Sequence, residues 1–116
     1  MADTYKVADH FDKKDPVVRE IYTRLLTTLK TFGPIVEEPK KTSIHLVRAS
    51  ALAGVETRKD FLLLNLKADH KISSARIEKA EQISAKRFHH RVRLTKPGDI
   101  DAELKAWLKH AYDISE

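Results

Sequence analysis

The residues best suited to chemistry form an alternating basic run near the end of the chain, RFHHRVRLT over residues 87–95. Successive side chains of a strand point to opposite faces, so one face of this run carries only basic residues. These residues are Arg87, His89, Arg91 and Arg93. At this spacing, several guanidinium groups can bind the same phosphate or carboxylate group. The run therefore predicts an anion-binding face. The alternative is that this face is simply solvated, or that its arginines pair with acids of neighbouring strands.

Two stretches of the chain contain bases but no acid. The bases are Lys40, Lys41 and Arg48 in residues 39–55, and Lys86, Arg87, Arg91, Arg93 and Lys96 in residues 82–98. If folding places the two stretches side by side, they form one positive face. We therefore expect Lys41, His45 and Arg48 to assist the basic run in binding nucleic-acid backbone or another anionic partner.

Readout of bases is not expected from this face. Proteins that bind single strands on a sheet usually stack the bases on aromatic side chains. The chain has one Trp, three Tyr and four Phe, and none of them belongs to the basic face, because Phe88 points to the opposite face of the strand. No helix-turn-helix or zinc-finger spacing occurs either. Electrostatic positioning on a backbone or another anion is the mode that this composition favours.

The histidines raise the question of a metal site. His89 and His90 are adjacent, so in a strand they point to opposite faces and do not bind the same ion. His89 would form a two-histidine site with His45 and Glu56 only if their strands are neighbours. His90 shares the apolar face of its strand, which is typical of a residue at the edge of the core. We predict no metal ion and no cofactor.

No catalytic residue set is recognisable. A Gly-x-Ser-x-Gly motif is absent, and the three glycines, Gly33, Gly54 and Gly98, lie too far apart for a phosphate-binding loop. We therefore expect a non-enzymatic binding or accessory module rather than an enzyme. One alternative is a small-ligand-binding or enzymatic domain with a pocket between sheet and helices, whose polar groups would be His45, Glu56, His89 or His90. A protein–protein docking module is a further alternative.

The composition excludes several classes of protein. The chain has 116 residues, with 22 Lys and Arg against 17 Asp and Glu and a formal net charge of +5. The absence of Cys excludes disulfides, thiol nucleophiles and Cys-ligated metal centres. No run of about 18 apolar residues is present, and residues 1–13 do not resemble a signal peptide. We expect a soluble, basic, cytoplasmic protein.

The periodicity predicts a single α+β domain over residues 14–116, preceded by a flexible arm over residues 1–13. Helices are expected over 16–32, from Ser73 or Ser74 over a short stretch, and from a start between 97 and 101 to the C-terminal region. Strands are expected at 42–49, 51–58, 61–66 and 87–95. The short connections favour an antiparallel sheet of about four strands, packed with the N-terminal and C-terminal helices.

The second face of the sheet carries apolar residues that need cover, namely Val47, Val55, Phe61 and Leu63. Either the C-terminal helix covers this face while the first helix covers the other, or two chains share it in a dimer. Two amphipathic helices suffice for both faces. We therefore expect a monomer or a weak homodimer.

Three stretches together resemble a known family: GPIVEEPKKTSIHLVRASALAGVETRKDFLLLNLKAD, RFHHRVRL and PGDIDAELKAWLKHAYDIS. The family that they resemble consists of small bacterial domains of unknown function, uncharacterised proteins that are sometimes labelled predicted transport proteins. The resemblance extends from Phe11 to Ile114 and implies a bacterial domain of the same kind. It supplies no catalytic set that can be transferred residue by residue.

Overall fold

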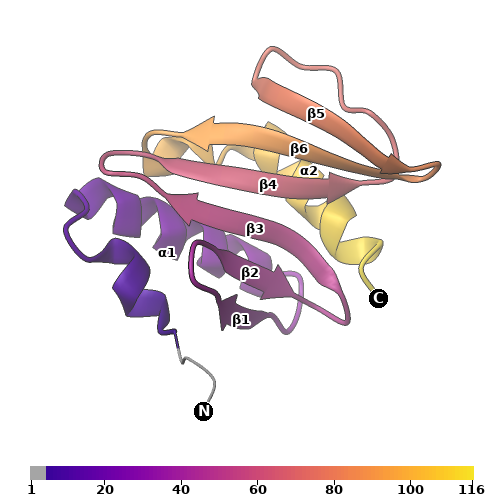
Figure 1. Cartoon of the computed structure of the whole chain (residues 1–116). Helices are drawn as coiled ribbons and strands as arrows, with labels where there is room; N and C mark the ends of the chain where they lie inside the picture. Colours follow the sequence, from indigo (N-terminus) through magenta and orange to yellow (C-terminus); the bar gives the residue numbers. More distant parts are fainter. Residues whose placement is uncertain (1–4) are drawn as a thin grey trace.

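Six antiparallel strands form one sheet in the computed structural model, which describes residues 5–116 (Figure 1). The strands are β1 (Val36–Pro39), β2 (Ile44–Val47), β3 (Ala51–Thr57), β4 (Leu62–Ala68), β5 (Ile77–Ser84) and β6 (Arg87–Leu94), in the spatial order β1-β2-β3-β4-β6-β5. The helices of this part of the chain are α1 (Pro16–Lys30), α2 (Ala102–Asp113) and the 3-10 helices η1 (Val7–Phe11) and η2 (Pro97–Asp99). The α+β class is confirmed, but the sheet has six strands rather than four.

Local chemistry explains the ends of helix α1. Asp15 occupies the N-cap position and Pro16 the first helical position, where the missing N–H of proline costs nothing. Apolar residues at helical spacing, such as Val18 and Leu25, are buried along one side. The chain then passes through Gly33 with a φ of +151°, a conformation that residues with a Cβ rarely adopt. The predicted helix over 16–32 is thus confirmed apart from its last two residues.

Strand β4 is the centre of the sheet, paired with β3 and β6. All of its residues are buried except Asn65, which is half-buried. Leu62, Leu64 and Leu66 face the helices and belong to the core. The intervening residues, which include Asn65 and Lys67, therefore point to the other face.

The two edge strands, β1 and β5, differ from the sequence expectations. Strand β1 contains two glutamates and ends at Pro39, and it lies at an edge of the sheet, where a missing N–H is tolerated. Strand β5 lies where the spacing predicts a short helix. It is mostly exposed and pairs along its length with β6, and this pairing overrides the weak helical pattern.

Both helices pack on the same face of the sheet, which leaves the other face open (Figure 1). The core joins Leu25 of α1, Leu108 of α2 and Leu64 of β4, all fully buried. The expectation that each helix covers one face is therefore wrong. Val55 also lies on the core face, because it pairs with Ile44 and with Leu64.

The N-terminal residues that the structure describes pack against the domain. The ring of Phe11 lies 5.1 Å from the ring of Tyr22, and Thr57 Oγ1 donates a hydrogen bond to the carbonyl oxygen of His10. Residues 1–4 of the predicted arm lie outside the described residues. Within residues 5–116, no helix has the length and apolar character needed to cross a bilayer.

Candidate anion-binding groove

A groove of about 540 Å³ is hollowed into the open face of the sheet. We call it the sheet groove. Its lining includes small hydroxyl side chains from the turns before β2 and β3, and larger polar side chains from β2, β3, β4 and β6. The hydroxyl residues are Thr42, Ser43 and Ser50, and the larger residues are His45, Glu56, Asn65, Lys67, Arg87 and His89. The groove lies on the face opposite the helices, so it differs from the pocket between sheet and helices that the ligand-binding alternative requires.

The strand register explains why this face is hollow. His45, Gly54, Asn65 and Arg91 lie side by side on β2, β3, β4 and β6. Gly54 has no side chain, and a Cβ at this position would lie 3.9 Å from His45 Cδ2 and 4.0 Å from Asn65 Cβ. Backbone therefore forms the floor of the groove between two taller neighbours.

Lys67 is a buried charge in the wall of the groove. The residue is only 9% exposed, and its Nζ donates a hydrogen bond of 3.1 Å to Ser50 Oγ. No carboxylate within residues 5–116 forms an ion pair with it. Burial lowers the pKa of Lys67, and the Arg87 guanidinium lowers it further. The groove thus contains a mostly buried cation without a counter-charge from the protein.

Arg87 and His89 lie beside Lys67 at the same end of the groove. His89 is directly opposite Lys67 in the pairing of β4 with β6. Partial burial lowers the pKa of the His89 imidazole, and Arg87 adds to this effect, whereas Glu81 on β5 acts more weakly in the opposite direction. Lys67, Arg87 and His89 form what we call the basic cluster. The positive charges of Lys67 and Arg87 make this end of the groove attractive to an anion, and the neutral His89 imidazole can donate a hydrogen bond to it.

Acids neutralise the other half of the basic run. Arg91 Nη2 lies 3.6 Å from Glu56 Oε2, and Arg93 Nε lies 3.0 Å from Glu78 Oε2. The Arg93 guanidinium also lies 4.4 Å from the centre of the Phe61 ring. Glu78 belongs to the neighbouring strand β5, whereas Glu56 reaches Arg91 from β3 across β4. Both arginines are thus paired with acids of other strands, and of the predicted run only Arg87 and His89 line the groove.

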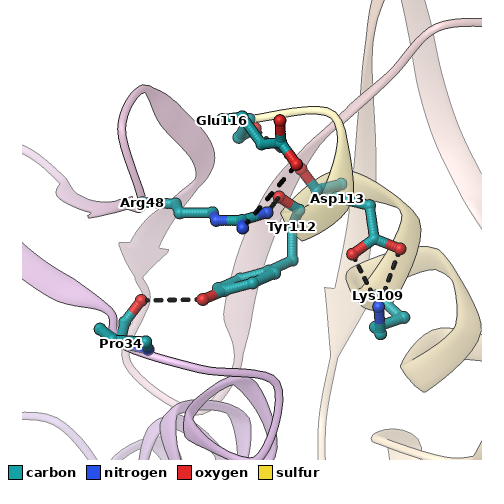
Figure 2. Close-up of polar contacts among 8 residues, drawn as sticks. Pro34, Arg48, Lys109, Tyr112, Asp113 and Glu116 are labelled. Carbon is teal, nitrogen blue, oxygen red and sulfur yellow. Dashed lines mark hydrogen bonds and ion pairs between the residues drawn. The ribbon is translucent and has the colours of Figure 1, made fainter.

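Arg48 belongs to a different part of the molecule (Figure 2). Its Nη1 donates a hydrogen bond of 3.0 Å to the Tyr112 carbonyl, and its guanidinium lies 4.3 Å from the centre of the Tyr112 ring. Its Nη2 lies 3.9 Å from Glu116 Oε1. Arg48 thus fastens the β2–β3 turn to the C-terminal end of α2, where a cation complements the helix dipole. Lys41 is exposed in the β1–β2 turn, outside the groove lining.

His45 and His89 lie on opposite sides of the groove. Strands β3 and β4 separate their strands, which places the two backbones about 14 Å apart. The condition for a two-histidine site with Glu56, that the strands of His45 and His89 are neighbours, is therefore not met. The two acid-free stretches do not lie side by side either, because β4 separates β3 from β6. His90 is buried in the core, where its Nε2 accepts a hydrogen bond of 3.0 Å from the Ile72 N–H.

Sequence reasoning missed Lys67, Asn65 and Ser50. A signal for the first two is present in FLLLNLKA, where polar residues alternate with leucines in a strand that is otherwise apolar. Lysine is rarely buried without a partner, so this position marks a special environment. Ser50 has no local signal, because its contact with Lys67 exists only after β3 and β4 have paired.

One known domain family covers almost the whole chain. Its model, described as a domain of unknown function (DUF5655), matches residues 7–115. The chain belongs to this family. The DUF5655 match includes every residue of the sheet groove, and it confirms the family resemblance found in the sequence. No curated protein and no solved structure matches the chain.

Proposed function

We propose that this DUF5655 domain is a non-enzymatic binding module that holds a phosphate or carboxylate group in the sheet groove. The observation that supports the proposal is Lys67, a buried cation beside Arg87 and without a carboxylate partner. Native proteins rarely retain such an arrangement unless a counter-charge compensates it. A bound anion supplies that counter-charge.

The basic cluster sets the expected affinity. The ammonium of Lys67 and the guanidinium of Arg87 each donate charge-assisted hydrogen bonds, which contribute about 1.5–3 kcal/mol apiece. Two such contacts total about 3–6 kcal/mol, and the cost of association offsets part of this gain, so we expect millimolar or weaker affinity for an isolated anion. A ligand that also contacts His45 or Asn65 across the groove binds more tightly.

Nucleic-acid backbone and small phosphate compounds present the same chemical group to this cluster. The two classes differ in how binding depends on salt. Because Arg91 and Arg93 are already paired and the lowered pKa of His89 leaves its imidazole neutral at pH 7, a single strand meets two cations, Lys67 and Arg87. The slope of log K against log salt should therefore be about −1.4. The absence of aromatic residues from the groove lining favours contacts to phosphates over stacking of bases.

The proposal is tested by titrating the protein with inorganic phosphate, followed by amide NMR spectra, and with labelled single- and double-stranded DNA and RNA, followed by anisotropy over a salt series. Lys67→Met and Arg87→Ala should weaken binding at least about tenfold. Arg24→Ala is the matched control, because it removes the same charge from the exposed side of α1. It should leave binding unchanged.

The outcomes separate the two sources of phosphate. Phosphate shifts at Gly54 and Lys67 without oligonucleotide binding indicate a small ligand, and oligonucleotide binding with the expected slope indicates a nucleic-acid backbone. The proposal is overturned if tens of millimolar phosphate leave the groove signals unchanged and no oligonucleotide binds at low salt. Equal weakening by Arg24→Ala would also overturn it.

A further inference from the structure

Three side chains at the surface bring metal-ligating atoms together. Asp69 and His70 directly follow β4, and His110 lies in the last turn of α2. His70 Nδ1 and His110 Nε2 each lie 2.8 Å from the same oxygen, Asp69 Oδ1. All three ligand atoms lie within 4.8 Å of one another. Two imidazoles from separate elements thus converge on one carboxylate.

We propose that Asp69, His70 and His110 bind a divalent transition-metal ion, for which Zn²⁺ is the best match. Zn²⁺ binds imidazole nitrogen and carboxylate oxygen at about 2.0–2.2 Å, and three protein ligands with water in the fourth position form a common set. Tetrahedral geometry at these bond lengths separates neighbouring ligand atoms by about 3.3 Å. The two contacts of 2.8 Å therefore need to lengthen by about half an ångström, which side-chain rotation achieves.

The backbone that carries these ligands is held in place, while the side chains have room to adjust. Ala68 precedes the site and Leu108 and Ala111 flank His110, and all three are at most 1% exposed. The imidazole rings of His70 and His110 already lie edge to face with centroids 5.4 Å apart. The side chains of Asp69, His70 and His110 are 46%, 61% and 40% exposed, so an ion and its waters have access.

The electrostatics of the cluster favour a cation at neutral pH. An aspartate carboxylate is ionised at neutral pH, so Asp69 offers a negative charge between the two imidazoles. An exposed hydrogen-bonded group of this kind contributes little to stability by itself. An ion at this position would replace both hydrogen bonds with coordinate bonds and would join the start of the β4–β5 connection to the end of α2.

The test uses tag-free protein, so that the chain's own histidines are the only ones present. Titration calorimetry with ZnCl₂ should show one equivalent of binding, and Zn²⁺ should raise the melting temperature. Asp69→Asn and His110→Gln should each lower the affinity at least about tenfold. His45→Gln, a histidine of the sheet groove, is the matched control and should bind like the wild type. Visible absorption of the Co²⁺ complex reports its coordination number.

Histidine ring NMR signals of the wild type provide a readout that depends on no variant. His70 and His110 should shift on addition of Zn²⁺, while the buried His90 does not. The proposal is overturned if millimolar Zn²⁺ leaves the His70 and His110 signals unchanged, or if Asp69→Asn and His110→Gln bind Zn²⁺ as tightly as His45→Gln. The phosphate titrations test the sheet groove and the Zn²⁺ titrations test this metal site, so either proposal can be refuted without affecting the other.

Discussion

A methyl group added at Gly54 probes the floor of the sheet groove without changing any charge. A Cβ there meets His45 and Asn65 at 3.9 and 4.0 Å, which are ordinary van der Waals distances. Alanine also loses less conformational entropy on folding than glycine, and in a strand the difference is about 0.5–1 kcal/mol. We therefore expect Gly54→Ala to raise the free energy of unfolding by about 0.5–1 kcal/mol. It should weaken phosphate binding, because the methyl group occupies the floor on which the ligand lies.

The same substitution at Gly33 should have the opposite effect on stability. Its φ of +151° costs a residue with a Cβ about 1–3 kcal/mol. The added Cβ would overlap the Tyr112 hydroxyl and lie 3.0 Å from Tyr112 Cζ, and that ring is held in place by Arg48. Overpacking of this kind costs about 1–3 kcal/mol more. Gly33→Ala should therefore lower the free energy of unfolding by about 2–6 kcal/mol.

Urea denaturation followed by circular dichroism measures both variants, and amide NMR spectra with inorganic phosphate measure binding by Gly54→Ala. A loss of more than about 1 kcal/mol in Gly54→Ala would refute the contact distances on which the prediction rests. Phosphate binding that is unchanged in a stable Gly54→Ala protein would show that the ligand does not lie over this floor. Stability of Gly33→Ala within about 0.5 kcal/mol of the wild type would refute the packing of Tyr112 on Gly33.

Three further predictions concern titratable groups. Burial lowers the pKa of His90 below 6.5, so the unfolded chain binds the proton more tightly and stability should fall as the pH drops below that value, by at most about 1.4 kcal/mol per pH unit. His90→Gln, whose amide oxygen can still accept from the Ile72 N–H, should flatten this dependence in urea titrations. Burial and Arg87 lower the pKa of Lys67 below 10.5, so the wild type should gain stability as the pH rises toward 10.5, and Lys67→Met should lack this gain. The pKa of Asp69 is about 2 against an ordinary 3.8, so its stabilising effect should be lost as the pH falls from 3.8 toward 2. Carboxyl NMR titration measures that value directly, and acid denaturation of Asp69→Asn should show no such loss.

A helix or strand is predictable from local sequence when its apolar residues repeat at the same spacing as its buried side chains. Helix α1 and strand β6 are examples, because Val18 to Leu25 and Phe88 to Leu94 repeat at the spacing of the face that packs. Strand β5 was not predictable in this way. Its residues are mostly exposed on both faces, and pairing with β6, which no local pattern encodes, holds it as a strand.

The candidate site was predictable only in part for a related reason. The alternation in β6 identifies Arg87 and His89, but it does not reveal that Glu56 and Glu78 neutralise Arg91 and Arg93 from other strands. The separation of His45 from His89 follows from strand order, which chain order does not determine. Both points were left open by the sequence because they depend on long-range strand pairing rather than on the properties of the residues.

The strand order also has a consequence for how the chain assembles. Strand β6 lies between β4 and β5 in space, although it follows both along the chain. Strands β5 and β6 are joined by only two residues and can form a hairpin early, whereas pairing of Leu62 with Leu94 closes a long loop and is slower. Until the hairpin docks, β4 has one unpaired edge and presents its leucines to other chains. The central strand of the native sheet is therefore the segment most exposed to aggregation during refolding, and the refolding yield should fall as protein concentration rises.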